Sequence, residues 1–300
     1  MSIRRVKYSV YFGFVARGNK NWDFLNEPQD SKLRHIRRAL WLSAKVENNA
    51  TFGTVQSYDG CGMSGGLEHQ VAVYPRNLSS QGTIFKTINT FPAPTLQRLT
   101  RELTGIGWEI NPNTGMLVNK TTGKMITGEE IRDEFTPVSG VVPASGPFFE
   151  RGKIWIEIFA ELFSDPRTFE AQILAGEQRI GSFDALERNV YGTRLSAGSN
   201  IPKNLKCTVD VNNDEDLALC VYHCFKVNAP AVARTCLKAT APYNDNLWPQ
   251  RLINTLAIKQ YGNWDTRYKK TRSIAMNSGL WPQELFGQGG IMPEYKKNNT

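Results

Sequence analysis

The stretch Lys45–Gln70, KVENNATFGTVQSYDGCGMSGGLEHQ, constrains the fold most, because it joins the end of a helix to a Gly-rich turn and a short strand. Upstream of it, apolar residues recur at the spacing of one helix face: Leu33, Ile36, Leu40 and Ala44. This stripe predicts a helix over 31–47 that packs against a core. The same spacing places Glu47 on the inward face, in the last turn of that helix.

Glu47 ends the predicted helix, where two effects act on its carboxyl group. Burial disfavours the charged form, and the C-terminus of a helix adds partial negative charge nearby. Both effects raise the pKa of the carboxyl group toward the range that suits a general acid near neutral pH. Glu47 is therefore the first candidate for a catalytic residue. The alternative is a solvated residue at a frayed helix end.

The composition permits a large globular chain with an anionic partner. The chain has 300 residues, of which 40% are hydrophobic, so it can bury a sizeable core. Its net charge of +8 either attracts an acidic polymer or nucleic acid, or serves solubility alone. Lysine and arginine are spread along the sequence without a helix-turn-helix, zinc-finger or RNA-binding signature, so we expect no nucleic-acid partner.

The cysteines and the N-terminus bear on the compartment. Five cysteines are an odd number in a chain of a size that needs no disulfides, which favours reduced thiols. Arg17 and Lys20 interrupt the apolar residues of the N-terminus, so we expect no signal peptide. The apolar runs are too short for a membrane span. These features predict synthesis in a cytoplasm.

The remaining elements predict a chain that is mainly α with a small β patch (α+β). Turns and a short strand are expected over 50–76, a helix over 95–104, a small β-meander over 107–126 and a short helix at EEIRDEF. Further helices are expected over 152–164, 167–175, 184–190, 214–227, 229–240, 248–261 and 265–277. Three prolines and two glycines in 136–148 predict either a lobe boundary there or a loop that lies across the surface, within one domain over 1–300.

The segment Tyr58–Leu67, YDGCGMSGGL, resembles the lysozyme-like superfamily, which includes lytic transglycosylases, goose-type and phage lysozymes, and chitosanases. Its members resemble one another in a catalytic glutamate that closes a helix, followed by a Gly-rich stretch containing Tyr-Asp. Glu47, the Tyr-Asp pair and Gly-Met-Ser-x-Gly at 62–66 match this pattern. The resemblance covers roughly 33–76 and implies a lysozyme-like bilobal domain with a cleft between its lobes.

The resemblance implies the chemistry of glycoside cleavage, which uses two carboxyl groups across the scissile bond. Glu47 would protonate the leaving oxygen, and Asp59 would stabilise the oxocarbenium-like transition state or position a water. An Asx turn is the alternative for Asp59, and Glu68 is the reserve second carboxylate. The substrate-binding candidates are Tyr58, Ser64, Glu68, His69 and Gln70. Phe52 is either a ring that stacks on sugars or a core residue.

The match departs from the family pattern after the Gly-rich turn. Relatives usually have a glutamine where this chain has His69, with Gln70 one residue later. A shift of one residue in a strand turns a side chain to the other face. Either His69 or Gln70 therefore lines the expected cleft.

Cysteine and histidine also permit a metal site. Cys220, His223 and Cys224 lie close on one predicted helix, and Cys207 or Cys236 would complete a zinc site. The alternative is a set of buried small side chains. We expect neither a metal nor a cofactor.

A thiol enzyme is the other alternative. Cys61 with His69 or His223 would supply a nucleophile and a base. Nothing in the sequence places Cys61 at the start of a helix, where a thiolate is stabilised. The sequence therefore favours the carboxylate chemistry.

The expected function is that of a peptidoglycan-degrading glycosidase, a muramidase or lytic transglycosylase, that cleaves β-1,4 linkages between amino sugars. We expect a phage lysin or a virion-associated protein, made in the host cytoplasm and acting on the cell wall or in the periplasm. Its partners would be peptidoglycan or a related amino-sugar polymer, together with virion proteins. The alternatives are a chitosanase-like hydrolase and a non-enzymatic virion structural or interaction protein that keeps the fold.

Overall fold

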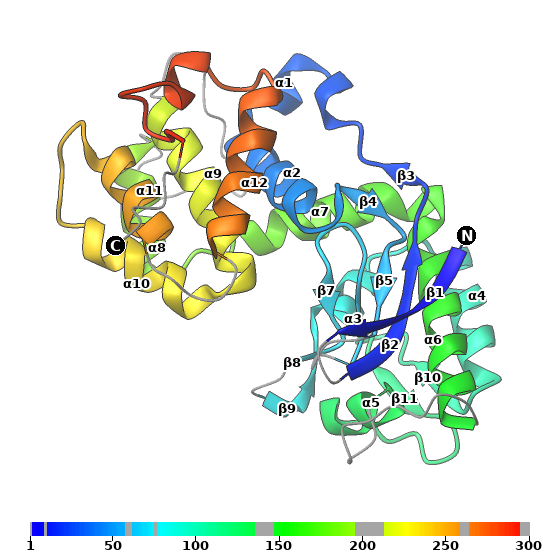
Figure 1. The fold of residues 1–300 in the computed structure, drawn as a ribbon. Coiled ribbons are helices and arrows are strands. Elements are labelled where there is room, and N and C mark those ends of the chain that lie inside the picture. The colour runs from blue at the N-terminus through cyan, green and yellow to red at the C-terminus, as the bar shows by residue number, and fades with distance from the viewer. Residues whose placement is uncertain are drawn as a thin grey trace. The chain divides into compact units, whose positions relative to one another are not determined.

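The computed structural model describes residues 2–8, 11–57, 62–74, 77–135, 147–195, 213–258 and 264–294. The chain is mainly helical with small antiparallel sheets, as the predicted α+β class requires (Figure 1). It divides into two compact units. The first unit contains Met1–Trp22 and Ala50–Ala175, and the second contains Asp23–Asn49 and Gly176–Thr300.

The first unit is built around a five-stranded sheet of order β1-β2-β5-β6-β7. Its strands are β1 Ser2–Tyr8, β2 Tyr11–Arg17, β5 Val55–Gln56, β6 Ser64–Gly65 and β7 Gln70–Val71. Three two-stranded sheets accompany it: β3 Lys20–Asn21 with β4 Thr51–Phe52, β8 Val73–Tyr74 with β9 Asn77–Gln81, and β10 Trp108–Ile110 with β11 Leu117–Asn119. The last pair confirms the β-meander predicted over 107–126.

Helix α6, Pro147–Ser164, forms the centre of this unit's core and packs on β2, β5 and β6 (Figure 1). Trp155, Phe159 and Phe163 recur on its buried face at helical spacing and are fully buried. Phe85 and Phe91 meet this row edge-on. The other helices are α3 Thr83–Ile88, α4 Ala93–Thr104, α5 Gly128–Phe135, the 3-10 turn η2 Pro166–Thr168 and the first part of α7 Phe169–Ile180.

The second unit is helical and is organised around α9, Asn213–Asn228, which packs against α2, α10, α11 and α12. Residues 217–222 of α9 are fully buried, as expected for a helix enclosed on all sides. The elements of this unit are η1 Phe24–Asn26, α1 Gln29–Lys32, α2 His35–Asn48, α8 Ala185–Arg194, α10 Pro230–Thr240, α11 Trp248–Ile258, α12 Trp264–Asn277 and η3 Gln283–Phe286. None of the described helices combines the length and the apolar character needed to cross a membrane.

The predicted helices after residue 150 are confirmed, with ends that differ by a few residues. Two predictions need correction. The helix predicted over 31–47 is broken, because Arg34 has an extended backbone that separates α1 from α2. The lobe boundary predicted near 136–148 is not where the units divide, because α5 and α6 on either side both belong to the first unit. Residues 136–146 themselves lie outside the described residues.

Candidate functional site

The end of helix α2 places Glu47 in its last turn, as the apolar stripe predicted. Asn49 follows with φ of 64° and caps the helix in the left-handed conformation, donating its N–H to the carbonyls of the final turn. Ala50 is also left-handed, with φ of 53°, which is uncommon for a residue with a Cβ. Its carbonyl accepts a hydrogen bond of 2.7 Å from the N–H of Trp22. Two consecutive residues with left-handed backbones therefore follow Glu47 and Asn48.

Glu47 forms an ion pair with Arg267 of α12. The Arg267 Nη1 donates to Glu47 Oε1 at 2.5 Å and to the carbonyl of Cys224 at 2.9 Å. In the amide orientation that satisfies both groups, the Asn228 oxygen accepts from Arg267 Nη2 and Nε at 3.2 Å. The side chains of Glu47 and Arg267 are 16% and 13% exposed. The carboxylate is thus held firmly at one oxygen while part of it remains accessible to solvent.

Two further cations lie near this carboxylate. Lys270 donates to the carbonyl of Val46. Burial lowers the pKa of Lys270, and the negative charge of Glu47 acts against this shift. Burial also lowers the pKa of Arg179 to about 10, again opposed by Glu47, so Arg179 stays charged at neutral pH. Glu47 is therefore surrounded by three positive charges.

The sequence did not predict these three cations as neighbours of Glu47. Arg267 and Lys270 come from α12, and Arg179 comes from the end of α7. The basic run RYKKTR on α12 was the available signal, but its pairing with Glu47, 220 positions away along the chain, is not readable from spacing.

The Gly-rich segment is described only in part, because Tyr58, Asp59 and Cys61 lie outside the described residues. Ser64 lies in β6 and is 2% exposed, and Glu68 is 1% exposed. His69 and Gln70, the other two described candidates for substrate binding, follow Glu68 in the chain.

His69 and Gln70 differ in their settings. His69 is half-buried with φ of 48°, a left-handed conformation. Gln70 lies in β7, is 4% exposed, and accepts a hydrogen bond from the hydroxyl of Thr87 at its Oε1. The side chain of Gln70 is thus buried and hydrogen-bonded within the protein, and His69 is the more accessible to solvent of the two.

Gly66 shows why glycine is needed in this turn. Its φ is 75°, and an added Cβ would lie 3.1 Å from the Gln172 Oε1 and 3.2 Å from the ring of Phe163. The same Gln172 oxygen accepts a hydrogen bond of 3.2 Å from the N–H of Leu67. The glycine therefore serves close packing against α6 and α7.

Phe52 is a core residue. Its ring is 3% exposed and stacks on Phe169 with centroids 4.0 Å apart. A ring enclosed in this way has no face for a sugar, so the stacking role proposed for Phe52 is wrong.

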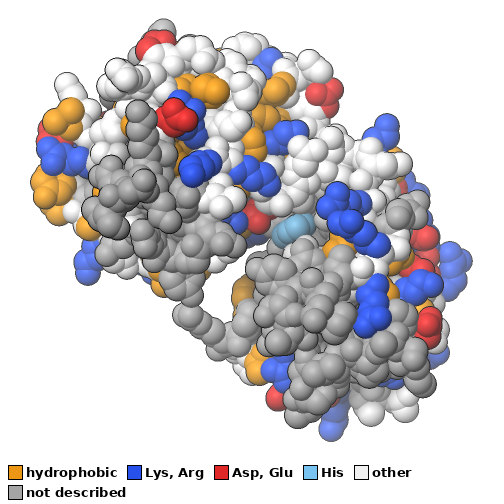
Figure 2. Space-filling model, viewed as in Figure 1, with side chains coloured by type: hydrophobic (Ala, Val, Ile, Leu, Met, Phe, Trp, Pro, Cys, Tyr) orange, Lys and Arg blue, Asp and Glu red, His pale blue; other side chains and the backbone are white. Residues whose placement is uncertain are grey.

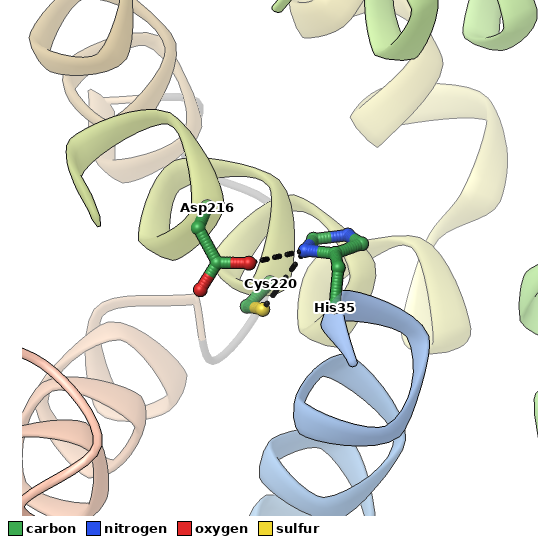
Figure 3. Close-up of side chains that lie close together, drawn as sticks. All are labelled: His35, Asp216 and Cys220. Atoms are coloured by element: carbon green, nitrogen blue, oxygen red, sulfur yellow. Dashed lines mark hydrogen bonds and ion pairs between the residues drawn. The ribbon is translucent and has the colours of Figure 1, made fainter. Parts of the chain in front are cut away.

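A second cluster of reactive groups lies at the start of α9, where Asp216 meets His35 and Cys220 (Figure 3). The His35 Nδ1 lies 2.6 Å from Asp216 Oδ1 and 3.7 Å from the Cys220 sulfur. Arg38 donates to both oxygens of Asp216, at 2.8 and 2.9 Å, and the Trp281 indole N–H donates at 2.7 Å. Burial alone would raise the pKa of Asp216, but the charge of Arg38 and the bond from His35 hold it well below its ordinary value.

This cluster is suited neither to a metal nor to thiol catalysis. Four donors already use the lone pairs of Asp216, so a metal would have to displace Arg38. In a nucleophilic triad the thiol and the carboxylate bind opposite nitrogens of the imidazole, whereas here both lie beside Nδ1. His35 is also fully buried, which leaves no path for a substrate. The arrangement stabilises the fold.

Cys220, His223 and Cys224 lie on one helix, α9, as predicted, and all three are buried. The Cys220 sulfur lies beside His35 of α2. His223 is 4% exposed, and burial lowers its pKa well below the usual value. Burial also raises the pKa of the Cys224 thiol. Cys207, proposed as a further ligand, lies outside the described residues.

Surface charge is dispersed on the face shown in Figure 2, where lysine and arginine side chains occur at several separate places. Comparison with known proteins adds no relative: no family model, curated protein or solved structure matches the chain.

Proposed function

We propose that the chain is a lysozyme-like glycosidase that cleaves the β-1,4 linkages of peptidoglycan or a related amino-sugar polymer. The observation that carries the proposal is the setting of Glu47. It is a carboxylate in the last turn of α2, 16% exposed, held at one oxygen by Arg267 and followed by the left-handed pair Asn49–Ala50. The Gly-rich motif downstream in the sequence supports the same reading.

In this proposal Glu47 is the general acid. Arg267 binds Oε1, so Oε2 is the oxygen that would carry the proton to the glycosidic oxygen. The bond from that oxygen to the anomeric carbon then breaks, and the oxygen of a water or of the sugar's own 6-hydroxyl bonds to that carbon and gives its proton to a carboxylate, Asp59 or Glu47. Arg267, Arg179 and Lys270 stabilise the Glu47 carboxylate left after proton delivery. Proton delivery of this kind contributes about 10²–10⁴-fold to rate. Asp59 remains the proposed second carboxylate.

A free lysin and a virion-borne wall-degrading protein are both compatible with this chemistry. A second candidate function is that of a non-enzymatic virion structural or interaction protein. The ion pair itself favours this alternative, because an Arg–carboxylate contact with hydrogen bonds to a carbonyl and an amide is also a common way to join helices.

Glu47→Gln tests the proposal. Glutamine keeps the shape of the side chain but cannot deliver a proton, so clearing of a peptidoglycan suspension should fall by about 10²–10⁴-fold. The matched control is Glu27→Gln, because Glu27 also pairs with an arginine, Arg37, and is 19% exposed. The control should lose stability without losing activity.

Two results would decide against the enzyme. Wild-type protein that clears neither peptidoglycan nor chitosan would favour the structural alternative, and a Glu47→Gln protein with near wild-type clearing would remove Glu47 from catalysis. Clearing of chitosan alone would favour the chitosanase-like alternative. Product masses then separate hydrolysis from 1,6-anhydro formation, which differ by one water.

A further inference from the structure

A pocket of about 510 Å³ lies in the first unit, lined by residues from the end of β2, from α4 and from the C-terminal end of α6. Figure 1 shows where these elements lie in the unit. Its volume falls in the range of small-molecule sites, about 300–1,000 Å³. Such sites are mostly apolar, whereas this one is lined mainly by charged and polar groups. The charged and polar side chains are Arg17, Asn19, Arg98, Glu161, Ser164, Asp165 and Arg167. Its occupant should therefore be polar.

Arg167 is fixed in place by its neighbour Asp165. The Nε of Arg167 donates to both oxygens of Asp165, at 3.0 and 3.2 Å, and Nη2 donates at 2.7 Å. Asp165 is 7% exposed and Arg167 is 56% exposed. The guanidinium is thus oriented by a buried carboxylate, and Nη1 is the end that Asp165 does not use.

Arg98 of α4 has donors that the protein does not satisfy. Its Nε and Nη2 are buried and make no hydrogen bond within the described ranges. The carboxylate that pairs with it, Glu102, lies 3.6 Å from Nε, beyond hydrogen-bond distance. A buried donor without an acceptor destabilises the protein, so an acceptor that enters the pocket would be favoured.

Among the residues that line the pocket, three arginines face two carboxylates, and Asp165 is already engaged by Arg167. Glu102, which pairs with Arg98, does not line the pocket. Within the described residues Arg17 forms no ion pair, and neither does Glu161. Guanidinium forks match the geometry of carboxylate and phosphate oxygens.

We propose that this pocket binds a ligand through a carboxylate or phosphate group, held by Arg17, Arg98 and Arg167. Glu161 limits the affinity by repulsion, so the site would release its ligand readily. An acidic substituent of a glycan and a phosphate of a polyol-phosphate polymer would present the same chemistry. The site does not involve Glu47, and it would exist whether or not the chain is a glycosidase.

The test is calorimetric titration of the full chain carrying Glu47→Gln, which keeps binding separate from turnover. The probes are N-acetylmuramic acid, glycerol 3-phosphate and, as the neutral control, N-acetylglucosamine. We expect one or both acids to bind and the neutral sugar not to bind. Binding by the first acid alone identifies a carboxylate site, and binding by the second alone a phosphate site. Equal binding of all three, or none at millimolar concentration, overturns the proposal.

Variants of the lining residues locate the binding. Arg17→Gln and Arg98→Gln should each weaken binding about tenfold, the factor that corresponds to loss of about 1.4 kcal/mol. Arg17 is exposed at the end of a strand, so its variant should fold even where that of Arg98 does not. Arg101→Gln is the matched control, because Arg101 lies on the same helix, is exposed and does not line the pocket.

Glu161→Gln distinguishes the possible ligands most clearly, because the variant should raise the affinity for an anionic ligand and lower it for a cationic or neutral one. Removal of the repelling carboxylate should tighten the binding of an acid. A pocket that instead recognises a cation or sugar hydroxyls through Glu161 would lose affinity in this variant. Weaker binding in Glu161→Gln would therefore refute an oxyanion site.

Discussion

A carboxylate bound by an arginine lies at each end of α9: Asp216 at the N-terminal end and Glu47 at the C-terminal end. The two carboxylates differ in their exposure to solvent and in the number of hydrogen bonds they accept. At the N-terminal end, Asp216 is 2% exposed and accepts hydrogen bonds from Arg38, His35 and Trp281. At the C-terminal end, the carbonyl of Cys224 and the amide of Asn228 hold Arg267, which binds one oxygen of Glu47. The first carboxylate is enclosed, and the second is partly open to solvent.

The difference is the reason why we propose a chemical role for Glu47 and not for Asp216. A carboxylate with every lone pair in use cannot accept a proton or a substrate without breaking the network around it. A carboxylate held at one oxygen keeps its orientation and retains the other oxygen for chemistry. Substitutions at the two ends should therefore have opposite consequences for stability and activity.

Asp216→Asn should have the largest effect on stability. The amide cannot accept four hydrogen bonds, and Arg38 would be left as a buried charge without its partner. Breaking a buried ion pair in this way costs about 3–5 kcal/mol of unfolding free energy, measured by urea denaturation. The control is Asp214→Asn, in the same first turn of α9 and half-buried, where we expect a change within about 1 kcal/mol. If both variants lost the same unfolding free energy, the hydrogen-bond network around Asp216 would not stabilise the protein more than an ordinary acidic residue at the start of α9.

Trp281→Phe removes one donor from the same network. A hydrogen bond to a charged group contributes about 1.5–3 kcal/mol, so the loss should be smaller than for Asp216→Asn. Trp248→Phe is the matched control, because Trp248 is fully buried and its indole N–H makes no hydrogen bond within the described residues. A loss in Trp281→Phe no greater than in the control would show that the bond to Asp216 is not stabilising.

His223 lies between the two ends of α9 and should make stability depend on pH. Burial lowers its pKa well below 6.5, and the charges of Lys226 and Arg179 add to this. As pH falls below about 6.5, the unfolded chain binds a proton at this position while the folded chain does not. The unfolding free energy should therefore fall by up to about 1.4 kcal/mol per pH unit from this group alone.

The variant His223→Leu isolates this contribution. Denaturation curves between pH 7 and about 5 should fall less steeply for the variant than for the wild type, whatever its absolute stability. Identical slopes would mean that His223 has the same pKa in the folded and the unfolded chain, contrary to the expectation.

Local patterns in the sequence predicted most of the helices, because amphipathic spacing and breakers such as Pro166 are local signals. The division into units was not predictable, because α2 packs on α9, which is about 180 positions later in the chain. The site shows the same limit. The position of Glu47 in the last helical turn followed from the spacing of Ile36 and Leu40, whereas its partner Arg267 is known only from the packing of α12. Contacts between segments that are distant in the chain produce no periodic pattern in a single sequence, so they could not be predicted from it.

The prediction with the smallest expected effect tests whether Glu47, like Asp216, is a structural carboxylate in a buried ion pair. A double-mutant cycle with Glu47→Gln and Arg267→Gln measures the coupling between these side chains in unfolding free energy. The pair is 13–16% exposed, so we expect about 1 kcal/mol, at the upper end of the values for exposed pairs and well below those for buried ones. The comparison pair is Arg234 with Asp184, 51% and 34% exposed, where coupling should be weaker and more sensitive to salt. A coupling of 3 kcal/mol or more at Glu47 would match a buried structural pair. In that case the ion pair would be explained by stability, and the observation that carries the proposed general acid would support the non-enzymatic alternative instead.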